Sequence, residues 1–271
     1  MSYKTLTNYI EICYTLIKKE IQKMYRYETH LHTSPVSNCA KASVRESLEF
    51  YKSEGYDGVF LTNHFIENSA LFAEDANYEE LISFFFSDYD EALSVGKEIG
   101  IKVFPGVEFS FNGNHFLVFG LTKDWYLSHP DFYKMNFKDR LNLMREDGAF
   151  VSHAHPFDER HFIDHIKLLP RSVDAVEVIN VGKNDFMNSM ANVYADAYGL
   201  LKTAGSDNHY GGRGKCFAGI ECEEPILDVP DFISKARAGK INIFRIERED
   251  KESPFHDVPV KFSLSLNKIT E

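Results

Sequence analysis

The feature that most constrains this chain is a repeated alternation of short apolar runs with amphipathic stretches. Apolar runs of strand length lie at residues 58–62, 101–108, 115–119, 149–152, 173–179, 201–204, 217–222 and 241–246. Stretches with helical periodicity lie before or between them, at residues 5–24, 43–55, 78–98, 137–147, 162–169, 185–198 and 232–238. A strand-helix pattern repeated about seven times predicts parallel strands joined by helical crossovers, and therefore an α/β fold.

End signals support several of these helices. Ser43 and Glu46 have the spacing of a capping box, in which each side chain bonds the backbone N–H of the other residue. Gly55 and Gly100 directly follow two helical stretches, where a glycine readily adopts the left-handed conformation that ends a helix. We therefore expect helices that begin near residue 43 and end near residues 55 and 100.

Composition limits the class of protein. The 271 residues are 44% hydrophobic, which is enough for one barrel-sized domain, and no linker-like tract divides them. The formal net charge of −11 disfavours a nucleic-acid partner, because phosphate contacts need clustered lysine and arginine. The four cysteines form no CxxC pair, and no stretch approaches the roughly 20 apolar residues of a membrane span. Without an evident signal peptide, we expect a cytoplasmic protein with no membrane partner; its oligomeric state is not indicated.

Residues able to bind metal follow the ends of the predicted strands. In His30-Leu31-His32, strand alternation places both imidazoles on one face and turns the leucine toward the core. Further candidates at strand ends are His64, Glu108, His115, His153, His155, Asp207 and His209. Imidazole and carboxylate together suit zinc, iron or manganese. Since the carboxyl ends of barrel strands share one face, we expect these side chains to form a site there.

A tight turn is predicted at residues 111–114, where Asn112-Gly113 separates two apolar runs. A hairpin at this point would bring His115 back beside Glu108.

In order along the chain, five motifs resemble those of the PHP (polymerase and histidinol phosphatase) superfamily. They are His30-Leu31-His32, Thr62-Asn63-His64, Gly106-Val107-Glu108, Ala154-His155-Pro156 and Gly205-Ser206-Asp207-Asn208-His209. The resemblance covers residues 27–220 and implies a distorted (β/α)7 TIM-like barrel. With the helical periodicity at residues 5–24, we expect an extra N-terminal helix at residues 1–26, a PHP-like barrel at 27–246, and a tail at 247–271 that packs on the barrel.

The resemblance also implies two or three divalent transition metals. It assigns a first metal to His30, His32, Glu108 and Asp207. It assigns a second to Glu108, His115 and His155, and a third to His64 and His209. Glu108, Asp207 and His155 would be the catalytic residues, and metal-activated water would be the nucleophile.

The chain departs from the family pattern at two places. Members often carry Ser-Asp-Gly after the first motif, where this chain has Ser37-Asn38-Cys39. They often carry Thr-Asp-His at the second motif, where it has Thr62-Asn63-His64. Both changes remove a carboxylate and place the third metal in question. Cys39 is a possible replacement ligand, with a small buried thiol as the alternative.

Other polar residues admit two interpretations each. His153 is either a further metal ligand or a packing residue beside His155. Lys41, Arg160, Lys183 and Arg213 follow strand ends and are candidates for binding a substrate phosphate, with solvated loop charges as the alternative. Asn180 ends a strand on the same face. We expect His129, His161, His165 and His256 to be surface residues.

The resemblance and the expected ligands favour metal-dependent hydrolysis of a phosphate ester, with a small phosphorylated metabolite as the substrate. The alternatives are a nuclease or protein-tyrosine phosphatase of the same superfamily, an amidohydrolase-like hydrolase, and a non-catalytic metal-binding regulator. The acidic charge weighs against the nuclease. The sequence shows no typical site for a carbamylated lysine, which weighs against the amidohydrolase-like enzyme.

Overall fold

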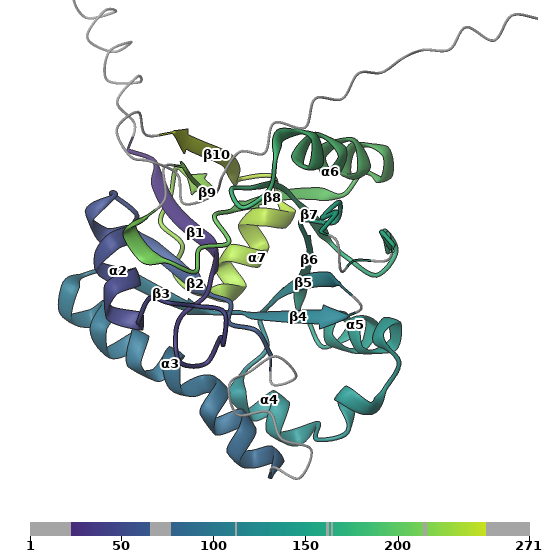
Figure 1. Ribbon diagram of the computed structural model, residues 1–271, viewed down its shortest axis with the longest axis horizontal. Helices are drawn as coiled ribbons and strands as arrows, with labels where there is room; N and C mark the ends of the chain where they lie inside the picture. The colour runs from purple at the N-terminus through teal and green to yellow at the C-terminus, as the bar shows by residue number, and fades with distance from the viewer. Residues whose placement is uncertain are drawn as a thin grey trace, which may run out of the picture.

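The computed structural model describes residues 23–65, 77–111, 113–160, 163, 165–213 and 216–247 (Figure 1). Its strands are β1 Tyr25–Leu31, β2 Gly58–Leu61, β3 Lys102–Pro105, β4 Val107–Phe111, β5 Asn114–Phe119, β6 Phe150–Ala154, β7 Ala175–Asn180, β8 Leu201–Gly205, β9 Cys216–Cys222 and β10 Asn242–Glu247. Its α-helices are α2 Val44–Ser53, α3 Tyr78–Ile99, α4 Lys123–Ser128, α5 Phe137–Glu146, α6 Asp185–Tyr198 and α7 Val229–Arg237. Almost all of the predicted N-terminal helix and of the C-terminal tail lies outside the described residues, so both stay predictions.

The strands form two mixed five-stranded sheets, in the orders β10-β9-β1-β2-β3 and β4-β5-β6-β7-β8. The pairs β1–β2, β2–β3, β6–β7 and β7–β8 are parallel, as the alternation predicted. The other pairs are antiparallel: β4–β5, at the predicted hairpin, and β5–β6, β1–β9 and β9–β10, which the alternation did not predict. Strands joined by a tight hairpin, such as β4 and β5, can pair only in the antiparallel sense.

The two sheets meet along two seams. At one seam, His64 forms an isolated bridge with Glu108, and the Glu108 N–H donates to the Asn63 carbonyl at 3.0 Å. At the other, Leu31 forms a bridge with Asn208. Single bridges and backbone hydrogen bonds, rather than extended ladders, join the two sheets at these seams within the described residues. The TIM-like barrel stays a prediction.

An aromatic core fills the space between the sheets at the end opposite the seam residues. Phe232 of α7 packs against Phe60 of β2, Phe119 of β5 and Phe150 of β6, with ring centroids 4.7, 5.3 and 5.6 Å apart. In Figure 1, α7 accordingly lies among the strands, whereas α2, α3, α5 and α6 lie around them. Because aromatic side chains bury large apolar areas, this packing ties both sheets to one helix.

Local signals explain most helix ends. Ser43 and Glu46 make the predicted capping box, and Gly100 ends α3 in the left-handed conformation, with a φ of 75°. The predicted helix at residues 162–169 was wrong for the described part of that segment, where residues 163 and 165–169 are not helical. The Lys167 N–H donates to the Asn114 side chain there, so the segment bonds to β5 instead of to itself. The short helix α4, which begins with Thr122 as its N-cap, was not predicted.

None of the helices in the described part of the chain has both the length and the apolar character needed to cross a bilayer.

Candidate metal centre

The end of β1 brings two imidazoles together. His30 and His32 are fully buried, and their Nε2 atoms lie 3.1 Å apart. Leu31 points the other way and packs in an apolar cluster with α2 and α3. The predicted alternation of the His-Leu-His run is therefore confirmed, and both imidazoles face the interior between the sheets.

Glu108 of β4 lies at the centre of the cluster. Its Oε1 atom is 2.8 Å from His115 Nδ1, 3.2 Å from His30 Nε2 and 3.6 Å from His155 Nε2. Its Oε2 atom is 2.7 Å from His64 Nδ1 and 3.3 Å from His32 Nε2. The β4–β5 hairpin pairs Ser110 with His115, as the predicted turn requires, and so returns His115 to Glu108.

Asp207 completes the cluster from the segment after β8. Its Oδ1 atom lies 3.4 Å from the Nε2 atoms of both His30 and His32, and its Oδ2 atom lies 3.7 Å from His155 Nε2. Asp207 and His155 have φ values of 51° and 29°, which are unusual for residues with a side chain. Residues in or shortly after six strands of the two sheets, β1, β2, β4, β5, β6 and β8, thus deliver ligand-type atoms to one region.

The charges in this region strongly perturb one another. Burial alone would raise the pKa of Glu108, but His115, His64 and His30 hold it well below its usual value. Burial would lower the pKa of His30, but Asp207, Glu177 and Glu108 raise it well above the usual value. The pKa of His32 is instead lowered by burial and by its neighbours His209 and His64. The cluster therefore favours ionised carboxylates that face a positive charge.

Glu177 of β7 is a positioning residue that sequence reasoning did not assign. It is fully buried, and its Oε1 atom accepts a hydrogen bond at 2.9 Å from His30 Nδ1. Its Oε2 atom accepts from the backbone N–H of His155 at 3.1 Å and from Asn180 Nδ2 at 2.8 Å. Asn180 also donates to Asp207 Oδ2 at 3.3 Å. When Nδ1 of the neutral ring donates to Glu177, the Nε2 lone pair points toward Glu108, as a metal ligand requires.

Glu28 of β1 is a second buried carboxyl behind the cluster. Its Oε1 atom accepts from the backbone N–H groups of His30 at 2.8 Å and Ser206 at 2.9 Å. Its Oε2 atom has no hydrogen-bond partner in the described part of the chain, and burial raises the pKa of Glu28 to about 7. In both cases the available signal was an acidic residue inside an apolar strand, at Tyr27-Glu28-Thr29 and Val176-Glu177-Val178.

Asn63 explains one departure from the PHP pattern. Its Oδ1 atom accepts from Ser37 Oγ at 2.9 Å and from the Thr33 N–H at 2.7 Å. Its Nδ2 atom donates to the buried carboxylate of Asp88 at 3.1 Å. An aspartate at position 63 would have no N–H group to donate to Asp88 of α3, and its carboxylate would face that buried carboxylate. Asp88 therefore favours asparagine over aspartate at this position.

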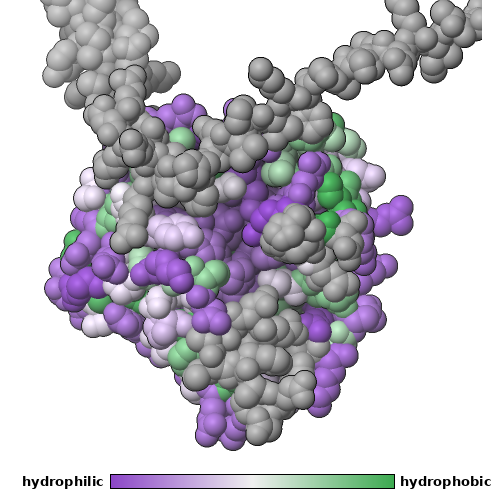
Figure 2. Space-filling view, viewed as in Figure 1, coloured by the Kyte–Doolittle hydropathy of each residue, from purple (hydrophilic) through white to green (hydrophobic). Residues whose placement is uncertain are grey.

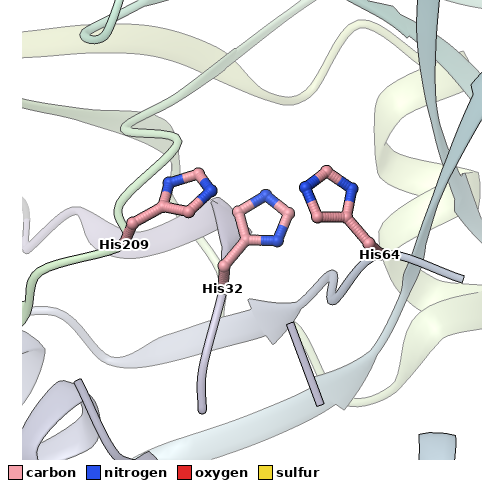
Figure 3. Close-up of side chains that lie close together, drawn as sticks. All are labelled: His32, His64 and His209. Carbon is pink, nitrogen blue, oxygen red and sulfur yellow. The ribbon is translucent and has the colours of Figure 1, made fainter. Parts of the chain in front are cut away.

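Three histidines form a stack beside the cluster (Figure 3). His32 lies between His209 and His64, with ring centroids 4.3 and 4.5 Å away. Cys39 is exposed and lies beside the outer two. Burial would raise the pKa of its thiol, but His209 and His64 lower it to about 6.

His153 lies apart from the cluster. It is buried against the ring of Phe116, with centroids 4.5 Å apart, and contacts Tyr194 edge-on. Burial lowers the pKa of His153 to about 3, so it is neutral. His153 occupies a packing position, whereas the left-handed turn at His155 directs that residue into the cluster. His129 stacks on Trp125, and His165 is exposed, so neither joins the cluster.

Two of the predicted phosphate-binding cations lie beside His155. Asp158 is buried and pairs with Lys183 Nζ at 2.9 Å and with Arg160 Nη2 at 2.5 Å. Its Oδ2 atom is 3.9 Å from His155 Nδ1. Lys41 is exposed, and its backbone N–H bonds the His209 carbonyl. The side chain of Arg213 lies outside what the structure describes.

The donor set fits divalent transition metals. Four overlapping groups place their ligand atoms within 4.8 Å of one another: His32, His64 and His209; His30, His32 and Asp207; His30, Glu108 and His155; and His64, Glu108 and His115. Glu108 Oε2 and His64 Nδ1 are buried and lie 2.7 Å apart as an ion pair, and the described residues offer neither atom a further hydrogen bond of good geometry. A cation bound between the carboxylate and the imidazoles would satisfy these buried atoms.

Comparisons with known proteins place the fold. No protein-family model and no curated protein matches the sequence. A two-domain protein of Bacteroides vulgatus, described as containing a predicted PHP-like metal-dependent phosphoesterase, superposes with a TM-score of 0.61 at 15% identity over 82% of this chain. The chain spans 65% of that protein's length. PsfC of Pseudomonas syringae superposes with a TM-score of 0.55 at 18% identity, over 84% of this chain and 93% of PsfC. The chain therefore shares its fold with these proteins.

Proposed function

We propose that this chain is a metal-dependent phosphoesterase that hydrolyses a small phosphorylated metabolite. The observation that carries the proposal is the convergence of Glu108 and Asp207 with imidazoles from both sheets. The fold shared with the Bacteroides vulgatus protein, which is described as containing a predicted PHP-like metal-dependent phosphoesterase, supports the proposal. The strands would then correspond to the distorted (β/α)7 barrel of that superfamily, with the site at their carboxyl ends.

Two or three ions of zinc, iron or manganese would occupy the four groups. His30, His32, Glu108 and Asp207 would hold one ion, and Glu108, His115 and His155 would hold a second. When bound, the metals would supply an activated water nucleophile and would neutralise charge on the phosphoryl group. Glu177 would keep the Nε2 lone pair of His30 toward its ion.

The chain itself would orient the substrate. Lys183 and Arg160 both pair with Asp158, which fixes two cations on the His155 side of the cluster. A phosphate bound to the metals would meet these cations, which would offset the charge that develops as the ester bond breaks. The face of the molecule drawn in Figure 2 is hydrophilic and hollowed in its middle, which suits a polar substrate.

A substrate screen tests the proposal. Full-length protein is stripped of metal, reloaded separately with zinc, iron(II) or manganese, and assayed with phosphate monoesters, a phosphate diester, a phosphotyrosine peptide, single-stranded DNA and a set of amides. We expect turnover of small monoesters. Turnover of amides alone would indicate an amidohydrolase-like enzyme, and bound metal without turnover of any substrate would indicate a regulator.

A charge-removing variant ties the activity to the cluster. Glu108→Gln should lose both bound metal and turnover, because a carboxylate shared between cations cannot be replaced by a neutral amide. Glu91→Gln, an exposed change on α3, is the matched control and should retain both. Metal content and turnover at the wild-type level in Glu108→Gln would contradict the proposal.

A further inference from the structure

A groove runs beside α7, the helix that packs at the end of the core opposite the metal cluster. It consists of two hollows of about 480 and 610 Å³, which adjoin because both are lined by Gly120 and Pro230. The first hollow extends from Pro230 to β3 and to Tyr89 of α3. The second extends along α7 to Arg237 and Gly148. An elongated groove of this kind is a common seat for an amphipathic helix.

The wall of the first hollow is mainly apolar. Its apolar lining residues are Tyr89, Val103, Phe104, Pro105, Leu121, Leu227, Val229 and Pro230. Leu227 is 66% exposed, the largest value for any large hydrophobic residue in the described part of the chain. At the far end of the groove, a side-chain carbon added to Gly148 would meet no atom within 4 Å, so this end is open. Exposed apolar surface gathered in a groove indicates a binding surface.

The described chain begins close to this groove. Lys23 Nζ pairs with Asp57 Oδ1 at 2.9 Å, and the Asp57 carbonyl accepts a hydrogen bond at 3.0 Å from the N–H of Lys102, which lines the groove. Within its sheet, β1 is separated from β3 only by β2, so the two lie about 10 Å apart at the usual strand spacing. The 22 residues that precede Lys23 therefore start within reach of the groove.

The sequence before Lys23 has the chemistry that the groove requires. With helical geometry, one stripe of it would be apolar, formed by Leu6, Ile10, Cys13, Ile17 and Ile21. A helix over residues 5–22 would be about 27 Å long. This length exceeds the roughly 10 Å to β3 and the roughly 13 Å of the nine residues of α7 taken together. One such helix can therefore cover the groove from end to end.

We infer that residues 5–22 dock in this groove as an amphipathic helix, with their apolar stripe against Leu227 and the first turn of α7. The occupant is thus a segment of the same chain rather than a second copy or another protein. Docking removes Leu227 and its apolar neighbours from water, which stabilises the fold. The inference is independent of the proposed function, because the groove and the metal cluster lie at opposite ends of the core.

Photo-crosslinking in the full-length protein tests the docking. A benzophenone-bearing amino acid takes the place of Leu227, and circular dichroism checks that the protein is folded. After irradiation and digestion, mass spectrometry should find crosslinks from position 227 to residues 5–22. The same probe in place of Val193, an exposed residue of α6 that does not line the groove, should give no crosslink to that segment.

Two variants test the apolar stripe itself. In the protein with the probe at position 227, Ile17→Ser should remove most of the crosslink, because it places a hydroxyl on the buried side of the helix. Lys19→Ser, the matched change off the stripe, should leave the yield unchanged. An equal yield in Ile17→Ser and in the parent protein would overturn the proposed packing.

The mass of the product identifies the occupant. A crosslink within one chain keeps the mass of a single chain on a denaturing gel, and this is the expected result. A product of twice that mass would show that a second copy fills the groove and would overturn the inference. Crosslinks from position 227 to other segments alone, or to a different protein, would overturn it as well.

Discussion

Replacement of Glu177 by glutamine changes a single buried group that touches three parts of the metal centre. The Oε2 position receives two donors, the His155 N–H and the Asn180 amide, so the glutamine oxygen must take that position. The glutamine NH₂ group then faces His30 Nδ1, which must become an acceptor. The ring proton of neutral His30 moves to Nε2, the atom that faces Glu108 and Asp207.

Two consequences of this change oppose each other. The pKa of His30 falls when Glu177 loses its charge, since that carboxylate is one cause of its elevation, and less competition from protons favours metal. A divalent ion, however, is attracted to the lost charge twice as strongly as a proton at the same distance. The proton on Nε2 must also be displaced. The net effect is a loss of metal affinity of about 10- to 100-fold, or about 1.4 to 2.8 kcal/mol. This is the range found when residues that hydrogen-bond metal ligands are replaced.

Chelator competition measures this loss for each ion. Glu177→Gln and the control Glu91→Gln are titrated with zinc against a chromophoric chelator at a fixed pH. Circular dichroism checks that both variants are folded. We expect weakened binding of the ion at His30, with bound metal lost after desalting. Wild-type affinity for every ion in folded Glu177→Gln would refute the tautomer argument.

Three further predictions concern stability. Because burial raises the pKa of Glu28 from 4.5 to about 7, the native state holds its proton between these values, and stability falls as pH rises through them. Metal-free Glu28→Gln should thus be more stable than wild type above pH 7, by at most ~3 kcal/mol, with the gap closing below pH ~4.5 in urea titrations. Asn63→Asp should lower the free energy of unfolding by about 1–3 kcal/mol at neutral pH, because its carboxylate faces Asp88. The double variant Asn63→Asp, Asp88→Asn should recover most of this stability. No recovery would show that the contact between residues 63 and 88 is not the cause of the loss. Chelation should lower the free energy of unfolding of the loaded protein by about 2.7 kcal/mol per ion when free metal was 100-fold above its Kd, and thermal unfolding of Glu108→Gln should not respond.

The sequence predicted those parts of the molecule that follow from local periodicity. Alternation in the His-Leu-His run indicated the direction of both imidazoles, and Asn112-Gly113 indicated the hairpin that brings the His115 side chain beside Glu108. The antiparallel pairing of β9 with β1 was not predictable in the same way, because residues nearly 200 positions apart pair there. His153 and His155 have the spacing of a shared strand face, yet the left-handed φ at His155 separates them.

Several features of the centre carry a cost in the metal-free chain. The left-handed φ values at His155 and Asp207 each cost on the order of 1–3 kcal/mol, and such strain persists only where the surrounding structure enforces it. Here the enforcing groups are at hand, since Glu177 binds the His155 N–H and Asn180 binds the Asp207 carboxylate. Packing alone gives no reason to retain this strain, because the aromatic core around Phe232 already joins the two sheets at the opposite end. A cation shared by Glu108 and the imidazoles would offset the strain and the buried charges together, which is why we propose that these residues bind metal rather than stabilise the fold.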